Sequence, residues 1–441
     1  MMLTLLITAV VGSLFGVVVG LLPGIGMTAA MISLFFYLTK FDPIVVCCFY
    51  ISCLTVSQYM GSVSATMLGV LGEASSIPAL AEGYEMNRQG RGREALAISA
   101  LGSWIGSFFA VVLAVVLASQ LQHVFVLNYT EIKLAFFGLL FLLMIMGSSN
   151  RWWISVAMIV VGYMVGKIGW NPYSNQTWGT MGIDVLASGI PEVTVLVCFY
   201  SLPLLLAAQI DQSHSIKNAE QNIRLFEGWK LLPKLAVIRG SVVGFLSGLI
   251  PFLTYVASTK FAWSVERFLD KKNYKLGHAP SLAAAETANN AAALTSLLPF
   301  LLFMVPIQLS EIVLLDIINM SGHRFTPDWV LQSGVFVGLI FAFFVANVIG
   351  VVFAWPLGQK VVSLINQYQR HIVVLSILLM LAAVIQTGLE VGQIAYYVST
   401  GIVLFAIGTW ARRWDVVPFV SAFMLAKPME LVFDIAIQKL F

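Results

Sequence analysis

The chain has 441 residues, of which 59% are apolar and only 10% are charged, and its formal net charge is +3. Soluble domains usually carry about a quarter charged residues, so this composition nearly excludes a water-soluble enzyme, a disordered chain and a coiled coil. The mean hydropathy of +0.91 instead indicates an all-α membrane protein that crosses the lipid bilayer many times. No run of Lys and Arg interleaves with aromatic residues, which argues against nucleic acid as a partner.

The apolar stretches predict the membrane segments. A spanning helix needs roughly 20 apolar residues, and the pattern predicts about ten to twelve segments, some of them broken or re-entrant. The stretches, in chain order, are residues 3–22, 27–38, 44–60, 95–119, 134–147, 153–165, 193–208, 235–250, 254–268, 291–305, 330–354, 372–385, 394–408 and 416–433. The first is expected to be a retained membrane helix, because it lacks the positive start of a signal peptide.

Charged loops set the predicted orientation and the domain boundaries. Cations concentrate in residues 82–94, 211–234 and 270–275, and the positive-inside rule places such loops in the cytoplasm. We predict an N-terminal membrane unit at residues 1–210, a cytoplasmic linker at 211–234 and a C-terminal membrane unit at 235–441. The predicted location is the inner or plasma membrane.

A spaced set of glycines and a proline occurs in both predicted units. Gly12, Gly16, Gly20 and Pro23 are each followed, 228 positions later, by Gly240, Gly244, Gly248 and Pro251. Close helix packing explains GxxxG spacing, but it does not explain why the proline recurs. The pattern therefore favours two internally repeated halves.

The prolines predict interrupted helices. Proline removes a backbone donor and glycine permits unusual dihedral angles, so residues 23–26 are expected to break a membrane helix, and Pro251 marks the matching point. Transporters built from repeated units place their substrate near the bilayer midplane, at interrupted helices between the repeats. The pattern therefore favours a secondary transporter.

Several stretches resemble the large membrane subunit of the tripartite tricarboxylate transporter family (TctA-like). They are residues 20–26 (GLLPGIG), 42–43 (DP), 60–66 (MGSVSAT), 82–90 (EGYEMNRQG), 239–251 and 286–291 (ETANNA). The resemblance keeps motif order along most of the chain, and Glu-x-x-Asn-Asn-Ala is its most specific element. Departures occur at Met60, at Leu71-Gly72 followed by Glu73, and at residues 251–254, where the family has Pro-Gly-x-Gly.

The resemblance implies function and partners. It implies uptake of a small organic carboxylate, such as a di- or tricarboxylic acid, driven by an ion gradient through alternating access. It also implies a small membrane subunit and a periplasmic solute-binding protein as partners. No cofactor is expected beyond Na⁺ or H⁺ as the coupling ion, and no metal beyond Na⁺.

The candidate substrate site is chosen for donors that are not permanent cations. A lone cation at the midplane costs several kcal/mol, whereas backbone N–H groups at helix starts, hydroxyls and amides can bind a carboxylate at lower cost. We predict substrate contacts from Pro23, Gly24, Gly26, Gly61, Ser62, Ser64, Thr66, Asn289, Asn290 and Thr295. The alternative for these small residues is tight helix packing.

The coupling ion is assigned to acidic and amide side chains. Glu286 shares a helix face with Asn289, because three residues separate them. Glu286, Asn289 and Glu73 are therefore the ion-coupling candidates, although Glu286 could equally cap a helix or lie at the membrane surface. A catalytic site is not expected, since HExxH, GxSxG and Walker A motifs are absent. The alternative function is a divergent channel-like or scaffold protein that kept the fold and lost carboxylate transport.

Overall fold

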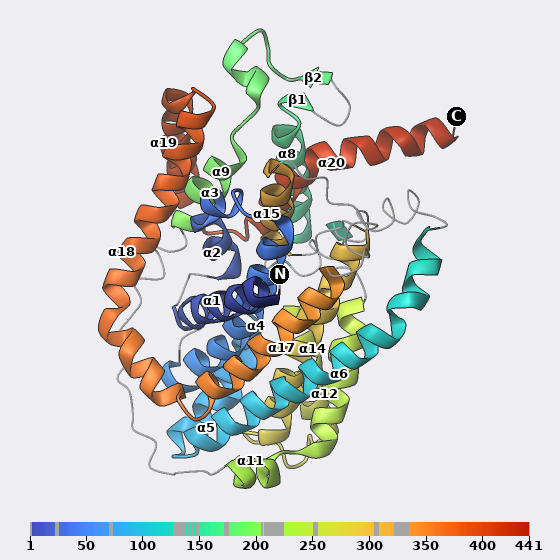
Figure 1. Ribbon diagram of the computed structural model, residues 1–441, viewed down its shortest axis with the longest axis vertical. Helices are drawn as coiled ribbons and strands as arrows, with labels where there is room; N and C mark the ends of the chain where they lie inside the picture. The colour runs from blue at the N-terminus through green and yellow to red at the C-terminus, as the bar shows by residue number, and fades with distance from the viewer. Residues whose placement is uncertain are drawn as a thin grey trace.

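A computed structural model describes residues 2–22, 26–69, 74–126, 150–171, 176–203, 225–249, 255–303, 308–321 and 335–440, together with isolated positions 138, 141, 142, 145, 148 and 206. These residues form a helical protein (Figure 1), as the composition predicts. Strand occurs among them only as a two-stranded antiparallel hairpin. The predicted segment 134–147 and residues 211–224 of the predicted linker lie largely or wholly outside this description.

The first half of the chain contains the elements α1 (Met2–Leu21), α2 (Met27–Ser33), α3 (Phe35–Leu38), α4 (Pro43–Leu68), η1 (Ala74–Ser76), η2 (Ala79–Gly83), α5 (Tyr84–Arg88), α6 (Gly92–Val126), α8 (Trp152–Gly166), β1 (Gly169–Asn171), β2 (Gln176–Trp178), η3 (Asp184–Ser188), α9 (Glu192–Thr194) and η4 (Val195–Ser201). The second half contains α11 (Leu225–Leu231), α12 (Lys234–Leu249), α13 (Tyr255–Leu269), α14 (Ala279–Phe303), α15 (Leu309–Met320), α17 (Val335–Ala354), α18 (Gly358–Glu390), α19 (Ile394–Ala411) and α20 (Val417–Leu440).

Many helices coincide with the predicted apolar stretches, but α15 matches none of them and α18 begins at Gly358, 14 residues before the predicted start at residue 372. Two further differences concern the helices that carry the predicted site residues. Helix α4 runs to Leu68 instead of ending near residue 60, and α14 begins at Ala279, 12 residues before the predicted start at Ala291. The added stretch of α4 carries hydroxyl side chains and that of α14 carries hydroxyl, amide and acidic side chains, which lower hydropathy without preventing a helix. Among the described residues, five helices are long and apolar enough to span a membrane: α1, α4, α6, α17 and α19. The total number of crossings stays a prediction.

Local signals explain where α4 begins and ends. The side chain of Asp42 accepts a hydrogen bond from the Ile44 amide at 2.9 Å, and Pro43 occupies the first turn, where its missing donor costs nothing. Gly69 adopts a φ of +69° at the other end, which terminates the helix in the left-handed conformation that glycine tolerates best. Because the helix ends only at Leu68, Ser62, Ser64 and Thr66 all lie within α4.

The two glycine ladders pack in the same way. A Cβ added to Gly12 would lie 2.7 Å from the Phe49 carbonyl oxygen, so α1 approaches the backbone of α4 closely. In the second half, a Cβ on Gly244 would lie 2.6 Å from the Ala288 carbonyl oxygen, so α12 approaches α14 in the same manner. Small residues permit such approach. The duplication itself stays a prediction, but each ladder fixes the position of one polar helix.

Helix α14 lies within the lower group of helices in Figure 1 and packs against α6, α12 and α13. Its Ala284 and Ala288 face the glycines of α12, while Thr287 packs against Gly102 and Gly106 of α6. Glu286 and Asn289 therefore lie on a third face of α14, and both residues are fully buried. The elements α5 and α11, from two of the predicted cytoplasmic loops, lie at the same lower end of the molecule.

Candidate functional site

The predicted site residues of the two halves meet between α4 and α14. The Ser62 hydroxyl on α4 donates a hydrogen bond of 2.6 Å to Oε2 of Glu286 on α14. From α6, the Ser103 hydroxyl donates to the Glu286 backbone oxygen at 3.3 Å. Asn289 and Asn290 follow one helical turn after Glu286 and are also buried. Helices α4 and α6 therefore both contact Glu286 of α14, one at its carboxyl group and the other at its backbone oxygen.

Gln58 extends this site along α4. It lies one turn before Ser62, and its Oε1 accepts a hydrogen bond of 2.7 Å from the Ser75 hydroxyl of η1. We call Gln58, Ser62, Ser75, Glu286, Asn289 and Asn290 the central polar cluster. All six side chains are buried, with at most 2% of any residue exposed.

Many polar atoms of the central polar cluster have no hydrogen-bond partner among the described residues. They are Oε1 of Glu286, Nε2 of Gln58, and both the oxygen and nitrogen of the Asn289 and Asn290 amides. Native proteins satisfy nearly all buried polar groups, so a concentration of orphaned atoms calls for an explanation. Amide nitrogens can donate to a carboxylate, while amide and carboxylate oxygens can coordinate a cation. The cluster thus offers chemistry for both an anion and its counter-ion.

The other predicted site residues have varied surroundings. Gly61, Ser62, Ser64 and Thr66 all lie inside α4. The segment is therefore not a helix start, and it offers its side-chain hydroxyls instead of free backbone N–H groups. The Thr66 hydroxyl has no partner among the described residues, and Ser64 is buried.

Thr295 and Gly26 do not join the Ser62–Glu286 contact. The Thr295 hydroxyl donates to the Ala291 carbonyl oxygen at 2.9 Å and packs against Gly248 of α12, an arrangement that suits helix packing. Gly26 precedes α2 in an extended conformation. Helix α1 ends at Leu21 and α2 begins at Met27, and the predicted helix break at residues 23–25 lies outside the described residues. Pro23, Gly24 and Glu73 lie outside the described residues.

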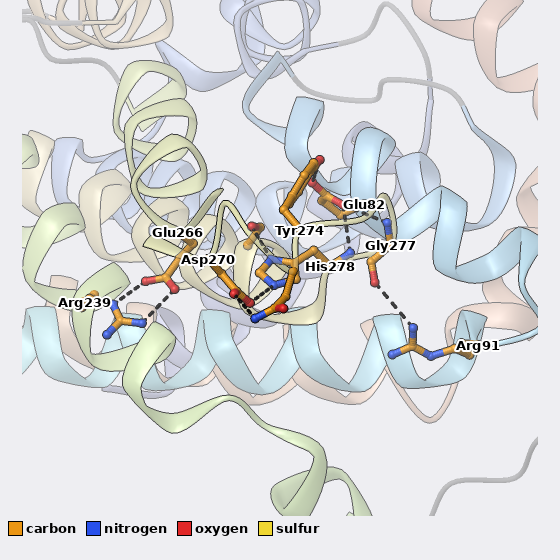
Figure 2. A network of polar contacts seen from close by, with 10 residues as sticks. Glu82, Arg91, Arg239, Glu266, Asp270, Tyr274, Gly277 and His278 are labelled. Carbon is orange, nitrogen blue, oxygen red and sulfur yellow. Dashed lines mark hydrogen bonds and ion pairs between the residues drawn. The ribbon is translucent and has the colours of Figure 1, made fainter. Parts of the chain in front are cut away.

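A second polar network lies near the C-terminal end of α4 and the N-terminal end of α14 (Figure 2). Glu82, in the turn before α5, is fully buried. Its Oε1 accepts hydrogen bonds from Trp263 Nε1 at 2.9 Å and the Tyr274 hydroxyl at 2.7 Å. Its Oε2 accepts from the backbone amides of Gly277 at 2.9 Å and His278 at 3.0 Å. We call these five residues the Glu82 clamp.

Charged and aromatic groups surround the Glu82 clamp. The Arg267 guanidinium lies 4.5 Å from the centre of the Tyr274 ring and 4.6 Å from that of Trp263. His278 Nε2 lies 3.1 Å from Oδ2 of Asp270, and this hydrogen bond holds the pKa of the Asp270 carboxyl below its ordinary value. Burial, with a further contribution from Glu82, raises the pKa of Tyr274 to about 12. The clamp thus joins two loops that are both predicted to be cytoplasmic.

Sequence reasoning missed Gln58, Ser75 and the role of Glu82. Gln58 lies within a stretch read as apolar, and only its spacing of four residues before Ser62 could have placed it on the same helix face. Glu82 is the first residue of a stretch that resembles the family's loop, but its four donors lie some 180 to 196 positions away along the chain. Nothing local in the sequence indicates such distant partners.

Fold and site together define a multi-pass helical membrane protein with a buried polar site between helices, the architecture of a membrane transporter. Comparison with known families narrows this class. Residues 6–420 match the Tripartite tricarboxylate transporter TctA family, and the chain belongs to that family.

Two curated relatives from Agrobacterium vitis support the match. The chain is 30% identical over 352 residues to an uncharacterized 52.8 kDa protein in the TAR-I ttuC' 3'region. This alignment covers 79% of this chain and 70% of the relative. It is 31% identical over 117 residues to an uncharacterized protein in the TAR-II ttuC' 3'region, covering 26% of this chain and 48% of that relative. No solved structure matches the chain significantly. The chain is therefore a component of a tripartite tricarboxylate transport system.

Proposed function

We propose that this protein is the permease subunit of a secondary active transporter for small di- or tricarboxylates, and that the central polar cluster binds the substrate. The observation that carries the proposal is the contact of Ser62 with Glu286, which brings together buried side chains with unpartnered donors and acceptors. Asn289 and Asn290 supply uncharged donors to a carboxylate, which avoids a fixed cation in the membrane interior.

The coupling ion is assigned to Glu286. Among the described residues, no Lys, Arg or His forms an ion pair with this carboxyl group. A buried carboxylate is costly without a counter-charge, so we expect Glu286 to take up Na⁺ or H⁺ together with the substrate. Asn289 is close enough along the helix to share that cation.

Family membership supports the expected partners. The tripartite system implies a small membrane subunit and a solute-binding protein, and we propose that both work with this chain at the inner membrane. The solute-binding protein would deliver the carboxylate to the outer side of α4 and α14. Movement of the helices would then expose the cluster to the cytoplasm.

Uptake into proteoliposomes tests the proposal. The purified permease, with and without its two partners, is reconstituted and offered labelled mono-, di- and tricarboxylates under an imposed Na⁺ or pH gradient. We expect accumulation of at least one di- or tricarboxylate under one gradient, and loss of accumulation when the gradient is dissipated. Currents at channel rates would contradict a carrier, and an absence of carboxylate binding would indicate a scaffold.

A further inference from the structure

We propose that the Glu82 clamp is a cytoplasmic latch which holds α4 and α14 together below the substrate site, and which must open for substrate to leave. This inference rests on the proposed function. It concerns residues outside the central polar cluster and adds a gate to that site.

The clamp crosses between the two halves of the chain at every contact. Glu82 belongs to the first half, whereas its four hydrogen-bond donors all belong to α13 or to the loop that leads into α14. Two weaker contacts cross at the same place: Gln89 donates to the Leu276 carbonyl oxygen at 3.3 Å, and Arg91 to that of Gly277 at 3.5 Å. Figure 2 shows Glu82 beside the loop that carries Tyr274, Gly277 and His278.

The clamp also holds the two helices that build the site. Gly83, the neighbour of Glu82, packs against the Thr66 side chain of α4, one turn beyond Ser62. Gly277 and His278 directly precede the first residue of α14, and Glu286 follows eight residues after His278. At about 1.5 Å per residue, Glu286 lies roughly 12 Å along α14 from the clamp. The helices that meet at Ser62 and Glu286 are therefore tied again at their cytoplasmic ends.

The composition of the clamp suits a reversible contact. All four hydrogen bonds are accepted by the Glu82 carboxylate, and each donor is a neutral group. Water can replace either partner when the clamp opens. The surrounding Arg239–Glu266 pair, at 2.8 Å between Nη2 and Oε2, joins α12 to α13 within the second half. That pair keeps α13 attached to α12 when the clamp opens.

Hydrogen exchange tests whether Glu82 is the residue that holds the loop. In Glu82→Gln, which keeps the shape and removes the charge, we expect the amides of Gly277 and His278 to exchange about tenfold faster. Glu85→Gln is the matched control, because Glu85 lies in the same segment but pairs with exposed Arg88 at 3.2 Å. Unchanged exchange in Glu82→Gln would overturn the inference, whether or not the protein transports carboxylates.

A reversible cross-link tests whether the clamp must open. Cysteines at positions 89 and 276 are joined by a short, reducible bis-thiol linker; the four native cysteines are buried. We expect linkage to stop uptake and reduction to restore it, whereas linking cysteines at positions 85 and 88, both within the first half, leaves uptake unchanged. Uptake at the unlinked rate in fully linked 89/276 protein would overturn the latch. Failure of the wild type to import any carboxylate would contradict the proposed function instead.

Discussion

The central polar cluster and the Glu82 clamp lie along the same pair of helices, yet their polar atoms are satisfied to different degrees. Both oxygens of Glu82 accept two hydrogen bonds each. In the cluster, Glu286 Oε1 and the amides of Asn289 and Asn290 have no partner in the described protein. An unsatisfied buried polar group costs about 1–3 kcal/mol. The hydrogen bonds of the clamp therefore stabilise the fold. The unpartnered polar atoms of the cluster destabilise it, and a bound ligand that pairs with them would remove that free-energy cost.

The largest expected effect is on transport. Glu286→Gln removes the charge that we assign to ion coupling while keeping the shape of the side chain. We expect accumulation under an imposed gradient to fall to the level of empty liposomes, while exchange of labelled for unlabelled carboxylate persists. Glu94→Gln is the control. Glu94 lies outside the cluster, and its Oε1 forms an ion pair with Arg91 Nη2 at a distance of 2.6 Å. Wild-type accumulation by Glu286→Gln would remove Glu286 from the coupling mechanism.

A matched pair of leucine substitutions separates the two regions by stability. Glu82→Leu leaves four donors without their acceptor, and we expect it to lower the free energy of unfolding by about 3 kcal/mol. Asn289→Leu replaces an unpartnered amide by an apolar group of similar size, so we expect a change within about 1 kcal/mol. The measurement is the melting temperature in detergent. Equal losses in the two variants would show that the regions do not differ as described.

A glycine substitution tests whether helix packing positions the cluster. A Cβ on Gly244 would approach the backbone of α14, and rigid backbone cannot yield as a side chain can, so we expect Gly244→Ala to cost about 1–3 kcal/mol. The control is Gly338→Ala, whose new methyl would meet the end of the Leu5 side chain at 3.1 Å. We expect the control to be nearly neutral. The reverse order of the two melting temperatures would contradict the packing described for α12 and α14.

The smallest expected effect is on the titration of Tyr274, one of the five clamp residues. The Tyr274 pKa is raised from its ordinary value near 10 to about 12, by burial first and then by Glu82. Its contribution to stability is therefore present below pH 10 and is lost as the pH rises through about 12. The difference in phenolate absorbance between wild type and Tyr274→Phe reports this titration. In a Glu82→Gln background we expect the midpoint to move down, and an unchanged midpoint would argue against the contact.

Much of the fold could be predicted from the sequence because membrane helices depend on length and apolarity. The helix breaks predicted at Pro23 and Pro251 fall outside the described residues and stay predictions. The start of α14 was placed too late because Glu286, Asn289 and Asn290 lower the hydropathy of a helix that is buried by protein. The same polarity that obscured the helix boundary marks the site.

The site itself was only partly accessible to sequence reasoning. Family resemblance pointed to Ser62 and to the Glu286–Asn290 segment, and the structure brings these together. The Glu82 clamp could not be predicted, because its donors include two backbone amides, which carry no residue signature. The two glycine ladders share one packing mode, although a common origin for the halves is still to be tested.

Ligand-induced stabilisation of the wild type against Asn289→Leu tests the central claim most directly. A ligand at about 100 times its dissociation constant stabilises a protein by about 2.7 kcal/mol. With Na⁺ present and the pH varied, we predict that at least one di- or tricarboxylate raises the melting temperature of the wild type by several degrees and leaves that of Asn289→Leu unchanged. Equal shifts in both proteins would show that the carboxylate binds elsewhere, contradicting a substrate site between α4 and α14.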